Sequence, residues 1–166
     1  MAKKPTYLGM LNAIANGERG GHELFKTWGS ATKNKALKAT LSTLALRELE
    51  HSVAFEKRIH ELGYELRPPS DVAASKVLAK QIKLLDSKAG DLKKFAAFGF
   101  GTKRPDASAK KRQKKRETDS LLGALADTSI DAQTGALIGR FICEERDTGR
   151  MLHKAYKKLR KQSKRK

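Results

Sequence analysis

The sequence of 166 residues predicts an all-α protein built as an antiparallel four-helix bundle. Apolar residues recur at the helical spacing of three and four along almost the whole chain, and no segment shows the alternation typical of a strand. They form four segments of roughly 25 to 30 residues, each about 40 Å long as a helix. A basic connection separates the last two segments. This pattern is typical of a bundle with one long connection.

The first two helices are expected over residues 6–28 and 32–62. Pro5 suits the start of the first helix, because proline is tolerated where a helix begins. Gly29 ends the first helix and Gly63 the second, since glycine favours the backbone that stops a helix. The residues expected to face the core are Leu11, Ala15, Glu18, His22 and Phe25, then Leu41, Leu44, Glu48, His51, Phe55, Ile59 and Leu62.

The third helix is expected over residues 71–98, because prolines at 68–69 cannot continue a helix and Gly-Phe-Gly at 99–101 ends one. A short helical piece is expected at 120–126. The fourth helix should begin near Ser129, with Thr128 and Asp131 spaced as a capping box. The core-facing residues are expected to be Ala74, Leu78, Ile82, Leu85, Ala89, Leu92 and Phe95, then Ile138, Phe141, Glu145, Thr148, Leu152, Ala155 and Leu159.

Positive charge is concentrated in two blocks. Lys and Arg number 36 against 18 Asp and Glu, which gives a formal net charge of +18. A basic linker lies at about 101–118, and residues 150–166 hold nine basic and no acidic side chains. We therefore assign the bundle to residues 1–160 and a disordered basic tail to 161–166. The tail either keeps the protein soluble or attracts a polyanion such as RNA, DNA or an acidic membrane.

The composition also excludes several classes of protein. No run approaches the roughly 20 apolar residues that a membrane-spanning helix needs. The first residues, MAKKPTYLGML, lack the apolar core of a secretory signal. The single cysteine, Cys143, is expected to be partly buried, and it excludes a disulfide framework and a cysteine-cluster zinc site. A cytoplasmic protein is therefore expected.

Carboxylates interrupt three of the four apolar lines, at Glu18, Glu48 and Glu145. A buried carboxylate is costly unless it is paired, hydrogen-bonded or bound to a metal. Glu48 and His51 lie at i and i+3, and Glu18 and His22 at i and i+4, so each pair shares a helix face. Converging carboxylates and imidazoles inside a bundle are typical of an iron or manganese site. The alternative is a buried polar network in which these groups bond to each other or to arginines such as Arg47 and Arg146.

Two of these segments resemble the ferritin-like superfamily, specifically its rubrerythrin-like branch. The stretch AIANGERGGHELFKTWG is similar to the first ligand helix of that family, and LALRELEHSVAFEKRIHELG to its Glu-x-x-His helix. The likeness covers roughly residues 8–63. It implies a ferritin-like bundle with metal ligands at Glu18, Glu48 and His51. The rubredoxin module of the family is absent, because it needs two pairs of cysteines.

The last helix, around GRFICEERDTGRML, matches the family less well. Glu145 occupies the carboxylate position, but Thr148 stands where a second Glu-x-x-His motif would have its histidine. The third helix has no inward glutamate, and Asp86, on the flank of its apolar line, is the nearest substitute. His22 is either a further ligand, a group that orients Glu18, or a satisfied histidine near the core. The resemblance therefore leaves a dinuclear, a mononuclear and a lost site open.

The resemblance implies a non-haem iron protein, with manganese as the other metal, that acts as an oxidoreductase on peroxide or dioxygen. A second hypothesis is a degenerate ferritin-like bundle without a cofactor, whose basic tail binds nucleic acid or a larger assembly. A third is a ferritin-like oxygenase that acts on RNA. A homodimer is expected, because flat helix faces of such bundles often pair.

Overall fold

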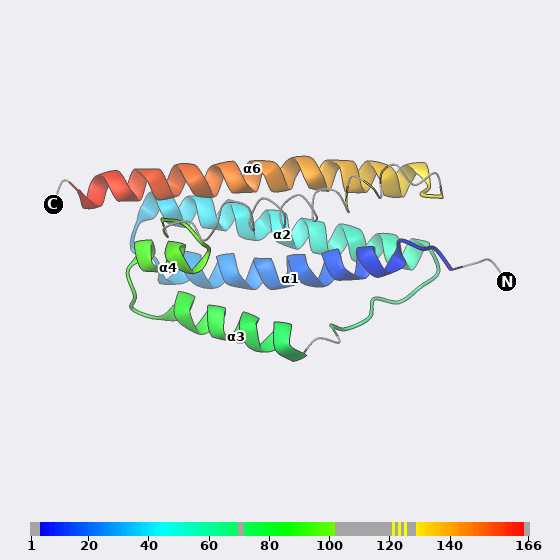
Figure 1. The fold of residues 1–166 in the computed structure, drawn as a ribbon, viewed down its shortest axis with the longest axis horizontal. Helices are drawn as coiled ribbons and strands as arrows, with labels where there is room; N and C mark the ends of the chain where they lie inside the picture. The colour runs from blue at the N-terminus through cyan, green and yellow to red at the C-terminus, as the bar shows by residue number, and fades with distance from the viewer. Residues whose placement is uncertain are drawn as a thin grey trace.

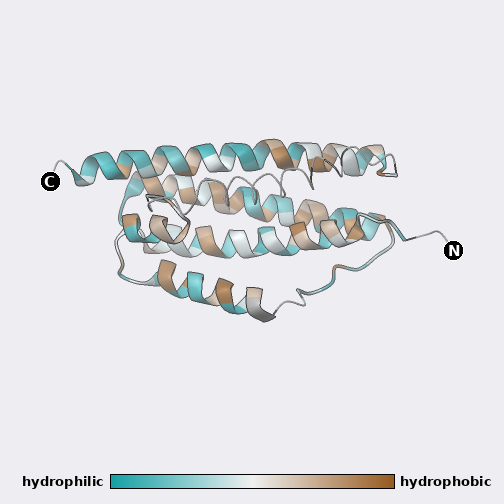
Figure 2. Cartoon of the chain, viewed as in Figure 1, coloured by the Kyte–Doolittle hydropathy of each residue, from teal (hydrophilic) through white to brown (hydrophobic). Residues whose placement is uncertain are grey.

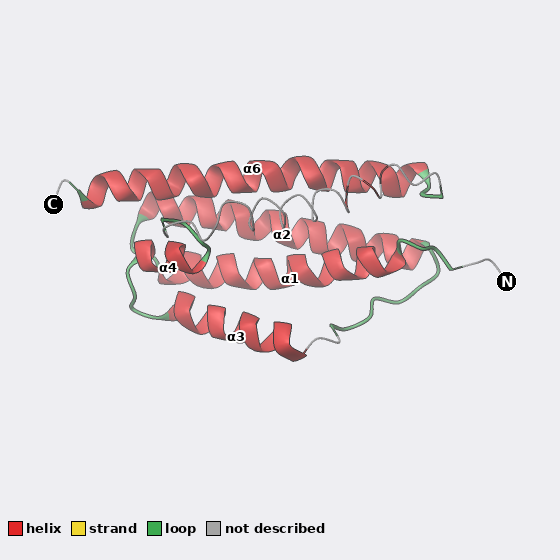
Figure 3. Cartoon of the chain, in the orientation of Figure 1, coloured by secondary structure: helices red, strands yellow, loops and turns green. Residues whose placement is uncertain are grey.

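The computed structural model describes residues 4–69, 72–101, 121, 123, 125 and 129–164 (Figure 1). All regular structure in this part of the chain is helical, which confirms the all-α prediction (Figure 3). The helices described with bounds are α1 (Leu8–Ala31), α2 (Lys35–Glu61), α3 (Val72–Asp86), α4 (Asp91–Ala97) and α6 (Ala132–Ser163).

Side-chain caps explain where α2 and α6 begin. The Asn34 side chain accepts a hydrogen bond from the Leu37 backbone N–H at 3.0 Å, so α2 starts three residues after the predicted position. Asp131 accepts in the same way from the Thr134 N–H at 2.9 Å, and α6 starts at Ala132. Thr128, the other residue of the predicted capping box, lies outside the described residues.

The single helix predicted over residues 71–98 is wrong, because the chain breaks between α3 and α4. The Ser87 hydroxyl donates to the Leu84 carbonyl at 2.7 Å, and Gly90 has extended backbone before α4. The buried Lys94 ammonium donates to the Leu85 carbonyl at 2.6 Å. These contacts satisfy carbonyls at the end of α3 that a continuing helix would otherwise use.

Trp28 fixes the position of α4 against the end of α1. Its ring is fully buried, and its indole N–H donates to Asp91 at 2.8 Å. The Thr32 hydroxyl donates to the other oxygen of the same carboxylate at 2.7 Å. The Phe95 ring meets Trp28 edge to face at 4.6 Å between centroids. The short helix is therefore held by polar and aromatic contacts together.

The helices are not arranged in strict antiparallel alternation. α2 packs along α1 and α6 and runs opposite to both, whereas α3 packs on α1 and runs in the same direction (Figure 1). α4 contacts α3 and α6. Among the described residues, α3 contacts only α1 and α4. The structure therefore confirms an all-helical protein whose helices pack side by side. The predicted antiparallel four-helix bundle is not confirmed.

Two apolar clusters lie on either side of a polar layer. The first includes Leu11, Ala15, Phe55, Ile138 and Phe141, from α1, α2 and α6. The second, toward the opposite end of these helices, is built around Trp28, Leu41, Leu44, Phe95 and Leu152. Burial of each large side chain stabilises the fold by about 1.5–3 kcal/mol. The predicted core lines are confirmed best in α1, α2 and α6, whereas Ala74 in α3 is exposed.

Two other sequence predictions need correction, and two concern residues that lie mostly outside the described ranges. α6 continues to Ser163, so residues 161–163 of the predicted disordered tail are helical. Cys143 is exposed, which corrects the expected partial burial. Most of the basic linker and most of the predicted helical piece at 120–126 lie outside the described residues. Among the described helices, none is both long and apolar enough to cross a bilayer.

Candidate metal centre

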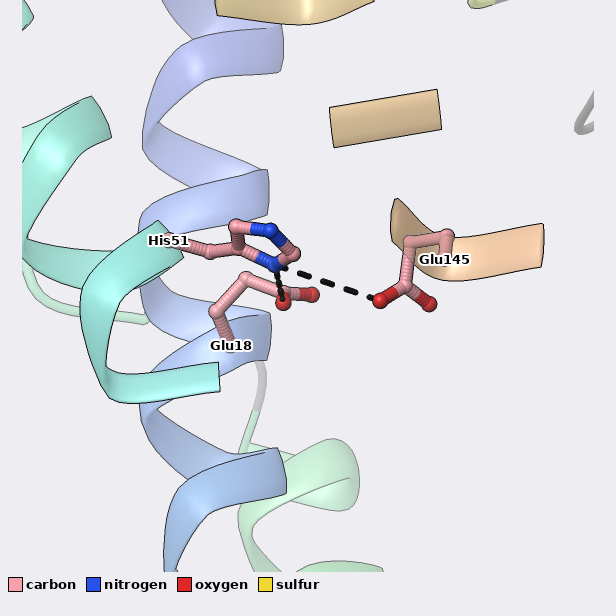
Figure 4. A group of neighbouring side chains, drawn as sticks. All are labelled: Glu18, His51 and Glu145. Carbon is pink, nitrogen blue, oxygen red and sulfur yellow. Dashed lines mark hydrogen bonds and ion pairs between the residues drawn. The ribbon is translucent and has the colours of Figure 1, made fainter. Parts of the chain in front are cut away.

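The polar layer brings together acidic side chains from three helices around one histidine. Glu18 comes from α1, His51 from α2 and Glu145 from α6, and one ligand atom of each lies within 4.8 Å of the others (Figure 4). Glu18 and His51 are 9% and 4% exposed. These three residues were predicted as metal ligands from their positions on the apolar lines. The structure therefore brings together three of the residues that the sequence singled out, and their role as metal ligands stays a prediction.

His51 uses both ring nitrogens in this layer. Nδ1 lies 2.9 Å from Glu18 Oε2 and 3.9 Å from Glu145 Oε1, and Nε2 lies 2.6 Å from Glu144 Oε2. Burial disfavours the imidazolium, but the hydrogen bonds to Glu18 and Glu144 outweigh it and raise the pKa of His51. Both ring nitrogens thus lie within hydrogen-bond distance of carboxylates, an arrangement that favours the imidazolium.

Glu48 lies beside these residues and is 6% exposed. Burial, followed by repulsion from Glu18 and Glu145, raises the pKa of Glu48 to about 9, while Arg47 acts in the opposite direction. Glu48 is therefore protonated at neutral pH and shares a hydrogen bond with Glu18. This predicted ligand therefore borders the cluster as a neutral acid, and it is not one of the three residues whose ligand atoms lie within 4.8 Å of one another.

Gly21 on α1 provides the space for the Glu48 carboxyl group. A Cβ built at Gly21 would overlap a carboxylate oxygen of Glu48 and would come within 3.0 Å of its Cδ. At Gly17, one turn earlier, a Cβ would meet nothing within 4 Å. The missing side chain at Gly21 therefore lets α1 lie directly against the acidic group.

Glu145 supplies the least satisfied atom of the cluster. Its Oε1 is buried and has no hydrogen-bond partner among the described residues. Burial and repulsion from Glu18 raise the pKa of Glu145 to about 6, against the attraction of His51 and Arg47. A buried oxygen without a hydrogen-bond donor costs roughly 1–3 kcal/mol, and His51 Nδ1, at 3.9 Å, is too far away to donate to it.

Arg47 supplies part of the compensating charge from the edge of the layer. It donates to the Glu144 carbonyl and to the Thr148 hydroxyl, each at 3.1 Å, and pairs with Asp147 at 3.1 Å. Thr148, which stands where a second Glu-x-x-His motif would have its histidine, is buried and accepts a hydrogen bond from Arg47. Arg47, one of the two arginines named in the polar-network alternative, thus contacts this region.

Two other candidate ligands, His22 and Asp86, do not join the three clustered residues. His22 is half-buried, and its Nδ1 lies 2.7 Å from the Ala45 carbonyl, so this ring is satisfied by the α2 backbone. Asp86 is exposed at the end of α3.

Glu144 is the participant that the sequence analysis missed. It accepts from His51 and from the Arg140 guanidinium at 2.9 Å. Burial opposes ionisation, but His51 and Arg140 outweigh it and lower the pKa of Glu144. Phe141 lies three residues before Glu144 and Thr148 lies four residues after it, and this spacing was a signal that Glu144 shares their helix face. In metal centres, a carboxylate that accepts from the second nitrogen of a histidine orients the ring.

Comparisons of the chain with protein-family models, with curated proteins and with solved structures find no match.

Proposed function

We propose that this chain is a rubrerythrin-like non-haem iron protein, an oxidoreductase that acts on peroxide or dioxygen. Glu18, His51 and Glu145 would hold the metal, with Glu48 as a further carboxylate ligand. The observation that carries the proposal is the buried Oε1 of Glu145, which has no hydrogen-bond partner and lies 3.9 Å from the His51 ring nitrogen.

The donor set suits iron or manganese. Carboxylate oxygens with one imidazole are typical ligands of Fe(II) and Mn(II), whereas soft thiolate ligands are absent from this cluster. Iron bound to such a set supplies a reversible one-electron couple and free positions for a small oxidant. His51 would offer Nδ1, while Glu144 would keep its hydrogen bond to Nε2 and hold the ring in place. A mononuclear and a dinuclear site both fit these residues.

The competing explanation is a structural polar network. The bonds of His51 to Glu18 and Glu144, and those of Arg47 at the edge, are the contacts such a network would make. It leaves Glu145 Oε1 without a partner and needs Glu48 to be protonated. A divalent cation would relieve both conditions, which is why we favour the metal centre.

Metal content tests the proposal directly. Protein loaded with Fe(II) without oxygen and then desalted is expected to retain about one or two irons per chain by elemental analysis. Glu145→Gln should lose most of this iron, and Glu50→Gln, an exposed glutamate on α2 with a 70% exposed side chain, should retain it. The activity would be supported if the loaded protein and Glu50→Gln consume peroxide and Glu145→Gln does not. If the unmodified protein and Glu50→Gln both retain no iron, the residues form the structural network.

The ferritin-like arrangement, a homodimer and a cytoplasmic location stay predictions beside this proposal. Equilibrium sedimentation of the loaded protein measures the oligomeric state.

A further inference from the structure

The second half of α6 carries a shallow, open groove on one face of the helix, lined almost wholly by basic side chains. Its walls are formed by Arg150, His153, Lys154, Lys157, Lys158 and Lys161. No acidic residue occurs from position 150 to the end of the sequence. Strongly hydrophilic residues dominate this half of the helix (Figure 2). The charge thus lies on an ordered helix, and not only on the tail predicted from the sequence.

The lysines of this groove do not hold the fold together. Among the residues that the structure describes, Lys154, Lys157, Lys158 and Lys161 form no ion pair, whereas Arg47 bonds across to α6. Lys154 and Lys158, and likewise Lys157 and Lys161, lie at i and i+4, where like charges repel each other. This unpaired charge on one helix face is available to an anionic partner.

An aromatic group borders the groove. Gly99 and Gly101 have φ angles of +80° and +73°, and they place Phe100 between them against α6. The Phe100 ring lies 5.9 Å from the ring of His153 and 5.5 Å from that of Tyr156, between centroids. His153 is exposed and lines the groove. A flat exposed ring, supported by Phe100, therefore stands beside the lysines.

We propose that this groove binds single-stranded nucleic acid. Lysines along a groove can follow a phosphate backbone, and an exposed ring beside them can stack on an unpaired base. An acidic membrane fits less well, because helices that bind membranes present apolar side chains to the lipid. The large apolar side chains that are exposed in the described chain lie on other segments, at Leu46, Leu49, Val53, Val77 and Leu125. This binding does not depend on the metal centre.

The proposal is tested with a labelled single-stranded RNA of about 20 nucleotides. Fluorescence anisotropy measures its binding to the protein at several salt concentrations. The variant changes Lys154, Lys158 and Lys161 to Gln. The control changes Lys76, Lys80 and Lys83 to Gln, which removes the same charge at the same spacing from exposed positions on α3. We expect the groove variant to reduce the slope of log K against log salt by about 2, because each phosphate contact contributes about 0.7. The control should keep the slope of the unmodified protein.

A second variant tests the stacking ring. His153→Ala should weaken binding of the single strand about fivefold, at the lower end of what stacking on one base contributes. Binding of a duplex of the same length should be unaffected, because its bases are already stacked. Three results would overturn the proposal: equal effects of both lysine triplets, tighter binding to phosphatidylserine vesicles than to RNA, or no measurable binding to RNA at 100 mM salt.

Discussion

Replacing Glu48 by Gln should stabilise the metal-free protein at neutral pH. The pKa of Glu48 is raised to about 9, so the folded protein keeps this group protonated at pH 7. In the unfolded chain the same group ionises with a pKa of 4.5. Because each pH unit above that value costs about 1.4 kcal/mol, holding the proton at pH 7 costs about 3 kcal/mol. Glutamine has the shape of the neutral acid and carries no such cost.

The sign of the pH dependence follows from the same comparison. Between about pH 4.5 and pH 9 the folded state binds one more proton at Glu48 than the unfolded state, so stability falls as pH rises. The gain from Glu48→Gln should be near zero at pH 4.5 and reach about 3 kcal/mol at pH 7, an upper value because Glu18 and Glu145 relax with it.

Urea unfolding of metal-free protein at pH 5 and pH 7 measures this difference, with Glu50→Gln as the exposed control. A loss of stability in Glu48→Gln at pH 7, or a gain that is the same at both pH values, would show that Glu48 is ionised in the fold. Fe(II) should reverse the order of stability, because only the unmodified protein keeps the full set of carboxylates. The apparent cost of Glu48 in the metal-free state would then be explained by its use as a ligand.

Three further predictions concern packing and local electrostatics. Gly21→Ala should displace the Glu48 carboxyl and lower the Fe(II) affinity, measured by competition with a chelator, whereas Gly17→Ala should leave the affinity unchanged and stabilise the helix by up to about 1 kcal/mol. The pKa of Asp131 is lowered, although burial opposes this, by bonds from neighbouring donors. The contribution of Asp131 to folding stability is therefore present above the unfolded pKa of 3.8 and is lost in acid. The difference in melting temperature between the unmodified protein and Asp131→Asn should consequently shrink from pH 6 to pH 2.5. Trp28→Phe removes a hydrogen-bond donor to α4 and should cost about 1–3 kcal/mol in urea unfolding.

Helical periodicity was sufficient to predict α1, α2 and α6. It failed at residues 87–90 because Ala89 and Leu92 continue the apolar spacing through the break. What separates α3 from α4 is tertiary: the buried ammonium of Lys94 on a carbonyl of α3, and the Asp91 carboxylate on Trp28. Partners 63 residues apart along the chain leave no trace in local spacing.

The centre was predictable to the extent that polar residues interrupt apolar lines. Glu18, His51 and Glu145 stand where the period calls for apolar side chains, and the structure brings them together. Glu144 was missed because periodicity does not determine how far α6 is rotated about its axis, and two adjacent glutamates reach the layer from one turn. The role of Gly21 requires knowledge of the residue opposite, which no single helix contains.

The charge balance of the layer explains how one set of residues can suit both a polar network and a metal. Without a metal, the proton on Glu48 and the raised pKa of His51 both reduce the negative charge of the layer. A cation at His51 Nδ1, as proposed, would take the place of a proton on this nitrogen and would remove the reason for Glu48 to stay neutral. In the proposed centre, protons and a divalent cation would therefore compete for the same oxygens and nitrogen. The buried Oε1 of Glu145 has no donor within the protonated network, and this asymmetry favours the cation.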